Sequence, residues 1–150
     1  MFHMNNDLFT TKTGGMFVTS ILGDYNLATN EIRWVKGGHQ PAIIRDNNGN
    51  YEKFESNSPP LGVIYQKDKS AYKTHIKKID NHRFYTFTDG LSESFNEKGE
   101  EIGIDGSIQI IEKNYNKDLK KQLSNITKEV IKTAEKNKLN DDLTLLSVGN

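Results

Sequence analysis

The chain has 150 residues, of which 34% are apolar and 27% charged, and its 20 basic side chains balance its 20 acidic ones. This length fits one domain with its own core, and the neutral balance gives no general attraction to nucleic acid or anionic lipid. The lack of cysteine excludes disulfides, thiolate chemistry and cysteine-bound zinc, and no stretch approaches the ~18 apolar residues of a membrane span. The start of the sequence has neither a basic leader nor an apolar signal core, so a cytoplasmic location is expected.

The first third of the chain predicts a short helix followed by antiparallel strands. The helix is expected over residues 1–9, and the turn-rich segment TTKTGG at 10–15 ends it. Asn48 and Gly49 form a strong hairpin turn signal between two of the strands. Runs of β-branched, aromatic and alternating apolar residues place these strands at 16–22, 31–36, 41–45 and 51–54, with a hairpin loop over 24–30.

The remainder of the chain adds further strands and a late helix. A proline-held loop over 56–62 precedes strand candidates at 71–79 and 83–88. Apolar residues then recur at helical spacing and predict an amphipathic helix over 117–137; they are Leu119, Leu123, Ile126, Val130 and Ala134. Residues 143–148 (LTLLSV) predict a closing strand. Antiparallel sheets with helices added late predict the α+β class.

Two acidic positions flank predicted strands. Asp89 and Gly90 end one strand, and Asp141 and Asp142 begin another. Carboxylates at strand ends suit Mg²⁺ or Mn²⁺, which prefer oxygen ligands, and Gly90 would let the backbone turn sharply beside an ion. Such a site can activate a water and neutralise a phosphoryl group. A plain turn is the competing interpretation, because Asp-Gly is a common turn pair that recurs at residues 105–106.

Other candidate residues give weaker signals. The Gly-Asp-Tyr segment at 23–25 is interpreted as part of a hairpin turn and not as a ligand. His39 follows two glycines in a loop, where it could hydrogen-bond near a site, although a structural role is the simpler interpretation. Trp34 is predicted to lie in the core. The remaining histidines show no ligand spacing with one another: His3, His75 and His82.

Residues 84–103, FYTFTDGLSESFNEKGEEIG, closely resemble a stretch of the bacterial type 2C serine phosphatases. In the subgroup typified by sporulation protein E and the sigma-factor regulators, this stretch reads strand, Thr-Asp-Gly, loop, Gly-Glu-x-x-Gly. Other segments resemble that family's landmarks in the same order: MFVTSIL, KGGHQPAII, SPPLGV and DDLTLLSV. The resemblance extends from about residue 5 to residue 148, and ordered landmarks are more specific than any single motif.

The resemblance implies part of an α-β-β-α sandwich that hydrolyses phosphoserine on a regulatory protein similar to an anti-anti-sigma factor. Family members hold two Mn²⁺ or Mg²⁺ ions whose bridging water attacks phosphorus, so no catalytic residue separate from the metal ligands is expected. By matching positions, Asp89 and Asp141 are the implied ligands. Thr88 and Gly90 would shape the turn of the first ligand, and Asp142 would support the second.

Two departures from the family pattern matter. The family's Asn-Ala-Gly-His segment reads Lys-Gly-Gly-His at residues 36–39, so no role of that asparagine is carried over. The family's Gly-Asp strand and its Asp-Gly-x-Gly-His-Gly motif supply the other metal aspartates and precede the Phe-Val-Thr strand, which only 15 residues precede here. We therefore expect residues 1–150 to form a single, N-terminally incomplete phosphatase domain with an incomplete metal site and weak activity.

Two alternatives to an enzymatic fragment stay open. One is a non-catalytic module on the same fold that binds a phosphoprotein or an upstream sensor domain. The other is a structural β-rich domain with coincidental motifs. The coding sequence upstream of Met1 would discriminate between the enzymatic fragment and the non-catalytic module, because it would show whether the missing metal-binding motif is present. Uncovered sheet edges or apolar faces would favour association, so a dimer is among the partners considered.

Overall fold

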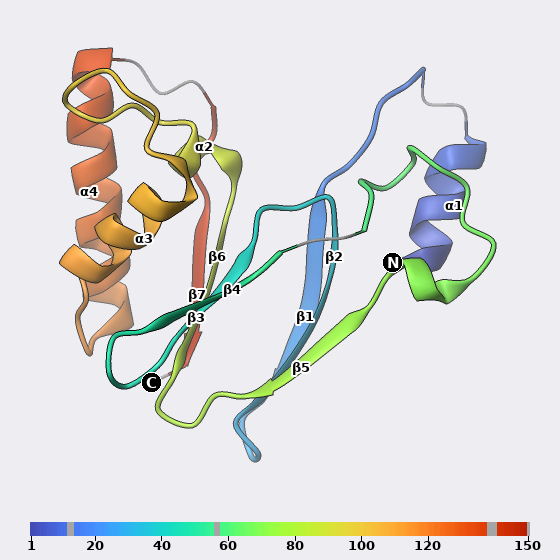
Figure 1. Ribbon diagram of the computed structural model, residues 1–150, viewed down its shortest axis with the longest axis horizontal. Coiled ribbons are helices and arrows are strands. Elements are labelled where there is room, and N and C mark those ends of the chain that lie inside the picture. Colours follow the sequence, from blue (N-terminus) through green and yellow to red (C-terminus); the bar gives the residue numbers. More distant parts are fainter. Residues whose placement is uncertain (12–13, 56–57, 138–140, 150) are drawn as a thin grey trace. The chain divides into compact units, whose positions relative to one another are not determined.

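The computed structural model describes residues 1–11, 14–55, 58–137 and 141–149, and of residues 134–137 the backbone alone. Antiparallel sheets combine with helices that lie mostly in a separate part of the chain, which confirms the predicted α+β class (Figure 1). The elements in chain order are α1 (Phe2–Thr10), β1 (Ser20–Asn26), β2 (Glu31–Gly37), β3 (Ala42–Arg45), β4 (Tyr51–Phe54), a short 3₁₀ helix (Lys69–Ala71), β5 (Thr74–Lys78), β6 (Arg83–Phe87), α2 (Asp89–Ser92), α3 (Gly103–Lys113), α4 (Leu119–Asn137) and β7 (Leu145–Gly149).

The chain divides into two compact units. The first consists of Met1–Pro41 and Phe54–Asp80, and the second of Ala42–Lys53 and Asn81–Asn150. The first unit contains a three-stranded antiparallel sheet in the order β1-β2-β5, and the second a four-stranded sheet in the order β4-β3-β6-β7. Each unit therefore carries a sheet of its own.

The core of the first unit forms around β2. Alternation along this strand turns Ile32 and Trp34 to the buried face, as the sequence predicts, and they are 5% and 2% exposed. The Trp34 ring stacks on His75 of β5 with 5.2 Å between centroids, and it meets Phe54 edge-on at 5.1 Å. These contacts confirm Trp34 as a core residue.

The core of the second unit joins its sheet to the helices. Figure 1 shows α3 and α4 beside β6 and β7. Each large apolar side chain that becomes buried contributes about 1.5–3 kcal/mol. The buried cluster contains Ile43, Tyr85, Phe87, Leu91, Ile111, Ile126 and Val130. The amphipathic helix predicted over 117–137 is α4, and its apolar stripe supplies the last two of these side chains.

Two buried arginines connect this sheet to the helical segments. Arg45 of β3 donates from Nε and Nη2 to the two carboxylate oxygens of Glu112 in α3, at 2.7 and 3.0 Å. This hydrogen-bonded pair holds the pKa of Glu112 below its usual value. Arg83 of β6 donates to the Gln122 side chain in α4 at 2.7 Å and to the carbonyl of Asn116 at 2.6 Å. The α3–α4 connection is thereby fixed against the sheet.

The hairpin loop was predicted over 24–30, but in the structure it begins three residues later, at residue 27. β1 begins at Ser20, not at residue 16, and it continues through Asn26, so the turn occupies residues 27–30. Asp24 lies inside the strand opposite Arg33 of β2. The Arg33 guanidinium donates to the Asp24 carboxylate at 2.9 and 3.0 Å, and this cross-strand ion pair extends the ladder past the polar Gly-Asp segment.

α3 was not predicted, and the interpretation of residues 105–106 as a turn was wrong. Both residues lie within this helix. Ile104 and Ile108 pack against the core cluster and Ile111 belongs to it, at the spacing of one helix face. Two glycines near the start of the segment obscured this periodicity. Within the described ranges, no helix combines the length and apolar character needed to cross a membrane.

The remaining predicted elements agree with the structure apart from their ends. The helix over 1–9 is α1, the hairpin strands over 41–45 and 51–54 are β3 and β4, and the closing strand is β7. The strand predicted over 71–79 is shorter, because residues 69–71 form the 3₁₀ helix. Three predictions fall partly outside the described residues. Residues 12–13 of the turn over 10–15 and residues 56–57 of the loop over 56–62 are not described, and neither is the side chain of Ala134.

Candidate metal site

The antiparallel pairing of β6 with β7 brings two acidic segments to one edge of the second sheet. Phe87, the last residue of β6, pairs with Leu145, the first residue of β7. Asp89 lies just beyond β6, where it opens the short helix α2, and Asp141 lies shortly before β7. The chain segments that carry the two predicted ligands are therefore neighbours, although they are far apart in the sequence.

Thr88 fastens these two segments together. Its backbone N–H donates to the Thr144 carbonyl at 3.0 Å, which continues the ladder beyond the strands. Its hydroxyl donates to the Asp142 carbonyl at 2.9 Å and accepts from the Thr144 N–H at 2.9 Å. The predicted supporting residue is thus bound three times to the segment that contains Asp141.

Gly90 lies against the same segment and has no room for a side chain. A Cβ at this position would lie 2.5 Å from the Asp142 carbonyl oxygen and 3.1 Å from that of Asp141. Because those atoms belong to the backbone, they cannot move aside as a flexible side chain would. The glycine next to the first acidic residue is therefore required by close packing, in addition to any effect on the turn.

The helix that begins at Asp89 is anchored in the core. Leu91 is fully buried, and the Ser94 hydroxyl donates to the Gly90 carbonyl at 2.6 Å. The Ser92 hydroxyl donates to the Asp89 carbonyl at 3.2 Å. These contacts hold the backbone of Asp89 in place, although its side chain remains partly accessible to solvent.

The acidic side chains themselves remain accessible to water. Asp141 and Asp142 are exposed, and one carboxylate oxygen of Asp141 accepts the N–H of Asp142 at 2.7 Å. Solvated carboxylates can each contribute an oxygen ligand to Mg²⁺ or Mn²⁺, while water completes the shell. Among the residues that the structure describes, no three or more His, Asp or Glu side chains gather as a metal cluster.

The loops that contain the Lys-Gly-Gly-His and Pro-Leu-Gly segments pack together in the first unit. The Gly38 N–H donates to the Ser58 carbonyl at 2.9 Å. Gly38 adopts a φ of +63°, and a Cβ there would lie 2.5 Å from the Pro60 ring. His39 is partly buried in this loop, with Nδ1 3.3 Å from the Gln40 carbonyl oxygen. The position of His39 near the acidic residues stays a prediction.

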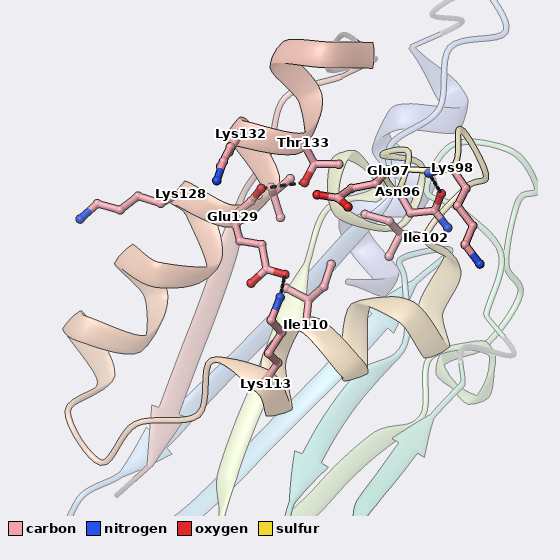
Figure 2. A pocket seen from close by; sticks show the side chains of 11 residues that line it. Asn96, Glu97, Lys98, Ile102, Ile110, Lys113, Lys128, Glu129, Lys132 and Thr133 are labelled. Carbon is pink, nitrogen blue, oxygen red and sulfur yellow. Dashed lines mark hydrogen bonds and ion pairs between the residues drawn. The ribbon is translucent and has the colours of Figure 1, made fainter.

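A cavity of ≈ 660 Å³ lies in the second unit, away from the Asp89 segment (Figure 2). Ile102, Ile110 and Val130 form its apolar part, and Figure 2 shows Lys113 of α3 directed toward Glu129 of α4, with 2.7 Å between Nζ and the carboxylate. Because none of the predicted ligands lines this cavity, its size does not identify it as the reactive centre. Its charged lining residues are Glu97, Lys98, Lys113, Lys128, Glu129 and Lys132.

Lys36 is a notable residue that the sequence interpretation passed over. It is only 2% exposed, and its ammonium donates to the Phe54 carbonyl. Burial lowers the pKa of Lys36 to about 8, although the charge of Glu55 opposes this shift. The sequence did contain a signal for its burial, because alternation along β2 puts Lys36 on the same face as Ile32 and Trp34.

Comparison with known proteins decides the family. The sequence matches the stage II sporulation protein E (SpoIIE) family over residues 1–149. The chain belongs to the SpoIIE family. This confirms the resemblance found in the motifs.

Two curated relatives of this SpoIIE-family chain are much longer than it is. Protein IcfG of Synechocystis sp. is 24% identical over 149 residues, which are 97% of this chain and 23% of that protein. Phosphoserine phosphatase RsbU of Bacillus subtilis is 25% identical over 145 residues, which are 96% of this chain and 42% of that protein. The chain thus spans less than half the length of each.

Solved structures support the same fold. The SiaA-PP2C domain of Pseudomonas aeruginosa matches with a TM-score of 0.76 at 13% identity, over 97% of this chain and 57% of that one. The phosphatase domain of SpoIIE from Bacillus subtilis, presoaked with Mn, matches with a TM-score of 0.68 at 19% identity, over 98% of this chain and 63% of that one. At these identities the likeness establishes the fold, which is that of type 2C phosphatase domains.

Proposed function

We propose that this chain is part of a metal-dependent phosphatase domain that hydrolyses phosphoserine on a regulatory protein, with Asp89 and Asp141 as ligands of Mn²⁺ or Mg²⁺. The observation that carries the proposal is the fastening of residues 88–90 to residues 141–144 at one edge of the sheet. Hydrogen bonds and close packing fix the backbones that carry both acidic residues. Such support keeps metal ligands in position.

The relatives are consistent with this chemistry. RsbU is named a phosphoserine phosphatase, one SpoIIE structure was presoaked with Mn, and an RsbX structure contains magnesium. The RsbX structure matches this chain with a TM-score of 0.61. Because the chain spans only part of the relatives, their activity and their metals are extended to it here as a proposal.

The proposed chemistry divides the work between the ion and the protein. A bound Mn²⁺ or Mg²⁺ supplies a water of lowered pKa and positive charge opposite the phosphoryl oxygens. Asp89 and Asp141 would hold the ion, and Thr88 and Gly90 keep their segments at the separation that the sheet sets. Asp142 contributes its backbone carbonyl to the Thr88 hydrogen bond, so its proposed role is to support the site.

Two carboxylates are too few for a two-ion centre. Two dications placed close together repel each other, and only enough fixed negative charge offsets that repulsion. The Asp-Gly-x-Gly-His-Gly motif, to which the family resemblance attributes further ligands, does not occur among the 150 residues. We therefore propose that these residues by themselves bind a single ion weakly and turn over substrate slowly.

The proposed substrate is a phosphorylated regulatory protein similar to an anti-anti-sigma factor, as in the regulators that the motifs resemble. A sensor domain on the same or another chain would provide the input, and the cytoplasm would be the compartment. His39 is the loop residue proposed to lie near the reacting phosphoryl group. These assignments rest on the family resemblance and on the support that the structure gives to residues 88–90.

The proposal is tested by calorimetric titration with Mn²⁺, with hydrolysis of a phosphoserine peptide measured in parallel. Weak binding of one ion is expected, and Asp89→Asn should abolish it because the amide lacks the charge of the carboxylate. Asp105→Asn is the matched control, since Asp105 is an exposed carboxylate in the same unit that pairs with Lys53 at 2.9 Å. This control should bind Mn²⁺ as the unchanged chain does.

Two results would contradict the proposal. Equal loss of binding in Asp89→Asn and Asp105→Asn would mean that Mn²⁺ associates with surface carboxylates in general. Tight binding of two ions, with turnover typical of complete enzymes, would mean that other residues complete the site. Binding of the phosphopeptide without turnover at any Mn²⁺ concentration would instead favour the non-catalytic module.

A further inference from the structure

Lys36 brings a positive charge into the interior of the first unit. It occupies the buried face of β2 with Ile32 and Trp34, and only 2% of its surface is exposed. A lysine on a strand normally reaches water with its ammonium. Here the side chain is buried, and its ammonium lies at the Phe54 carbonyl.

Among the described residues, one hydrogen-bond acceptor contacts this ammonium. A lysine ammonium has three N–H donors, and that of Lys36 donates to the Phe54 carbonyl. Among the described residues it has no ion pair with a carboxylate, and the nearby Glu55 is exposed. A buried cation without a paired anion is costly, so a structure that retains one suggests that an anion binds there.

A cavity of ≈ 350 Å³ adjoins the Lys36 side chain, at the small end of the range for ligand sites. Lys73 and Ser70 are exposed at its mouth, and His75 is partly buried beside Trp34. Lys36, Lys73 and His75 all line this cavity, and burial and then the charges of the two lysines lower the pKa of His75. Glu55 is the acidic residue of the described lining.

We propose that this cavity binds a tetrahedral dianion, either free phosphate or a phosphoryl group, between Lys36 at its base and Lys73 at its mouth. Two ammonium groups match the charge of a dianion, and charge-assisted hydrogen bonds to them are stronger than neutral ones. A neutral His75 ring can donate one further hydrogen bond. None of these residues belongs to the Asp89 segment, so the inference is independent of the proposed function.

The test uses sulfate and phosphate as probes, in titrations followed by amide NMR shifts of the intact chain. Saturable binding is expected, with shifts centred on Lys36, Ser70 and His75. Lys36→Met should weaken binding about tenfold or more, because a hydrogen bond to a charged group is lost. Lys67→Met is the matched control: Lys67 is exposed and does not line the cavity, so this variant should bind as the unchanged chain does.

A second set of variants keeps the proposal testable if Lys36→Met folds poorly. Lys73→Met should weaken sulfate binding because it removes the second cation, and Glu55→Gln should strengthen it because it removes the opposing charge. Sulfate keeps its charge across neutral pH, so its binding should weaken as the pH rises through about 8, where Lys36 loses its proton. Burial and the charges of Lys36 and Lys73 lower the pKa of His75, so its titration lies below this range; Lys73 and Glu55 are the other charged groups of the lining.

Several outcomes would overturn the proposal. Equal affinity in Lys36→Met and Lys67→Met would show a general surface effect. Acetate binding as tightly as sulfate would exclude selectivity for a dianion. Absence of saturable binding for both sulfate and phosphate would show that the cavity is not an anion site. If the site exists, a phosphoserine peptide that competes with sulfate identifies a protein phosphoryl group as the occupant, and a peptide that does not compete identifies free phosphate.

Discussion

Each unit contains a cation that is almost fully buried, and these two cations differ in the number of hydrogen-bond partners among the described residues. Arg83 of β6 and Lys36 of β2 are each 2% exposed. The terminal nitrogens of Arg83 donate to the Asn116 and Lys117 carbonyls and to the Gln122 side chain, at 2.6, 3.1 and 2.7 Å. Within the part of the chain that the structure describes, Lys36 donates to one carbonyl, that of Phe54. A cation with many partners connects structural elements, whereas one with few partners retains the capacity to bind an anion.

Replacement of Arg83 should have the largest effect. In Arg83→Met the partly buried carbonyls of Asn116 and Lys117 lose this donor, the Gln122 oxygen keeps only the Tyr85 hydroxyl, and the α3–α4 connection loses its attachment to the sheet. We expect a loss of about 3 kcal/mol or more in the free energy of unfolding, because three hydrogen bonds from a charged donor are lost and each such bond contributes about 1.5–3 kcal/mol. Urea denaturation followed by circular dichroism measures it. A loss below about 1 kcal/mol would break the comparison, since it would fall within the range of a single ordinary hydrogen bond.

Replacement of Lys36 should have a smaller effect of the opposite sign. Lys36→Met keeps the volume of the side chain and removes a charge whose burial is poorly compensated. We expect the free energy of unfolding at neutral pH to stay unchanged or to rise by about 1–2 kcal/mol. The same urea denaturation measures it in anion-free buffer. A large loss of stability would show that Lys36 is a structural cation like Arg83.

The hydroxyl of Thr88 should contribute about 1–2 kcal/mol to the free energy of unfolding. Thr88→Val keeps the shape of the side chain but removes the acceptor of the Thr144 N–H and the donor to Asp142. We expect a loss of about 1–2 kcal/mol in the free energy of unfolding, because both partners lie near water and recover part of their hydrogen bonding. Mn²⁺ affinity should fall with it, whereas Thr127→Val, on an exposed turn of α4, should leave that affinity unchanged.

The pH dependence of stability gives the smallest and most specific signal. Burial lowers the pKa of Lys36 to about 8 from its ordinary value of 10.5. Between these values the unfolded chain binds more protons at this residue than the folded chain, so its contribution to stability rises with pH there. We expect the stability difference between Lys36→Met and the unchanged chain to shrink from pH 8 to 10.5. A constant difference would contradict the lowered pKa.

The positions of most strands along the chain could be predicted because the local patterns were strong. Alternation identified β2 with Ile32 and Trp34 buried, and Asn48 with Gly49 identified the β3–β4 hairpin. α3 was not predicted because the glycines at both ends of its first turn resemble turn residues. In the structure, the four isoleucines of the helix pack in or against the core cluster and stabilise it. The bounds of β1 were predicted too early in the chain, because the Asp24–Arg33 ion pair joins two strands and cannot be recognised from one segment of sequence.

The acidic segments could be located from the motifs, but their contacts could not. The resemblance indicated Asp89 and Asp141, while the reason for Gly90 emerged only from the approach of the Asp142 carbonyl, a contact across many residues of sequence. Lys36 was overlooked because polar strand residues usually face water. The same alternation that buries Trp34 also buries Lys36, so the pattern contained the signal.

The central claim, that Asp89 and Asp141 share one metal ion, is tested most directly by paramagnetic broadening of amide NMR signals on addition of Mn²⁺. At low Mn²⁺ concentration we predict that the amides of residues 88–90 and 141–144 broaden together, because one ion lies between two segments that hydrogen bonds hold side by side. The broadening should disappear from both segments in Asp89→Asn and persist in Asp105→Asn. Broadening confined to one segment, or unchanged in Asp89→Asn, would contradict the claim.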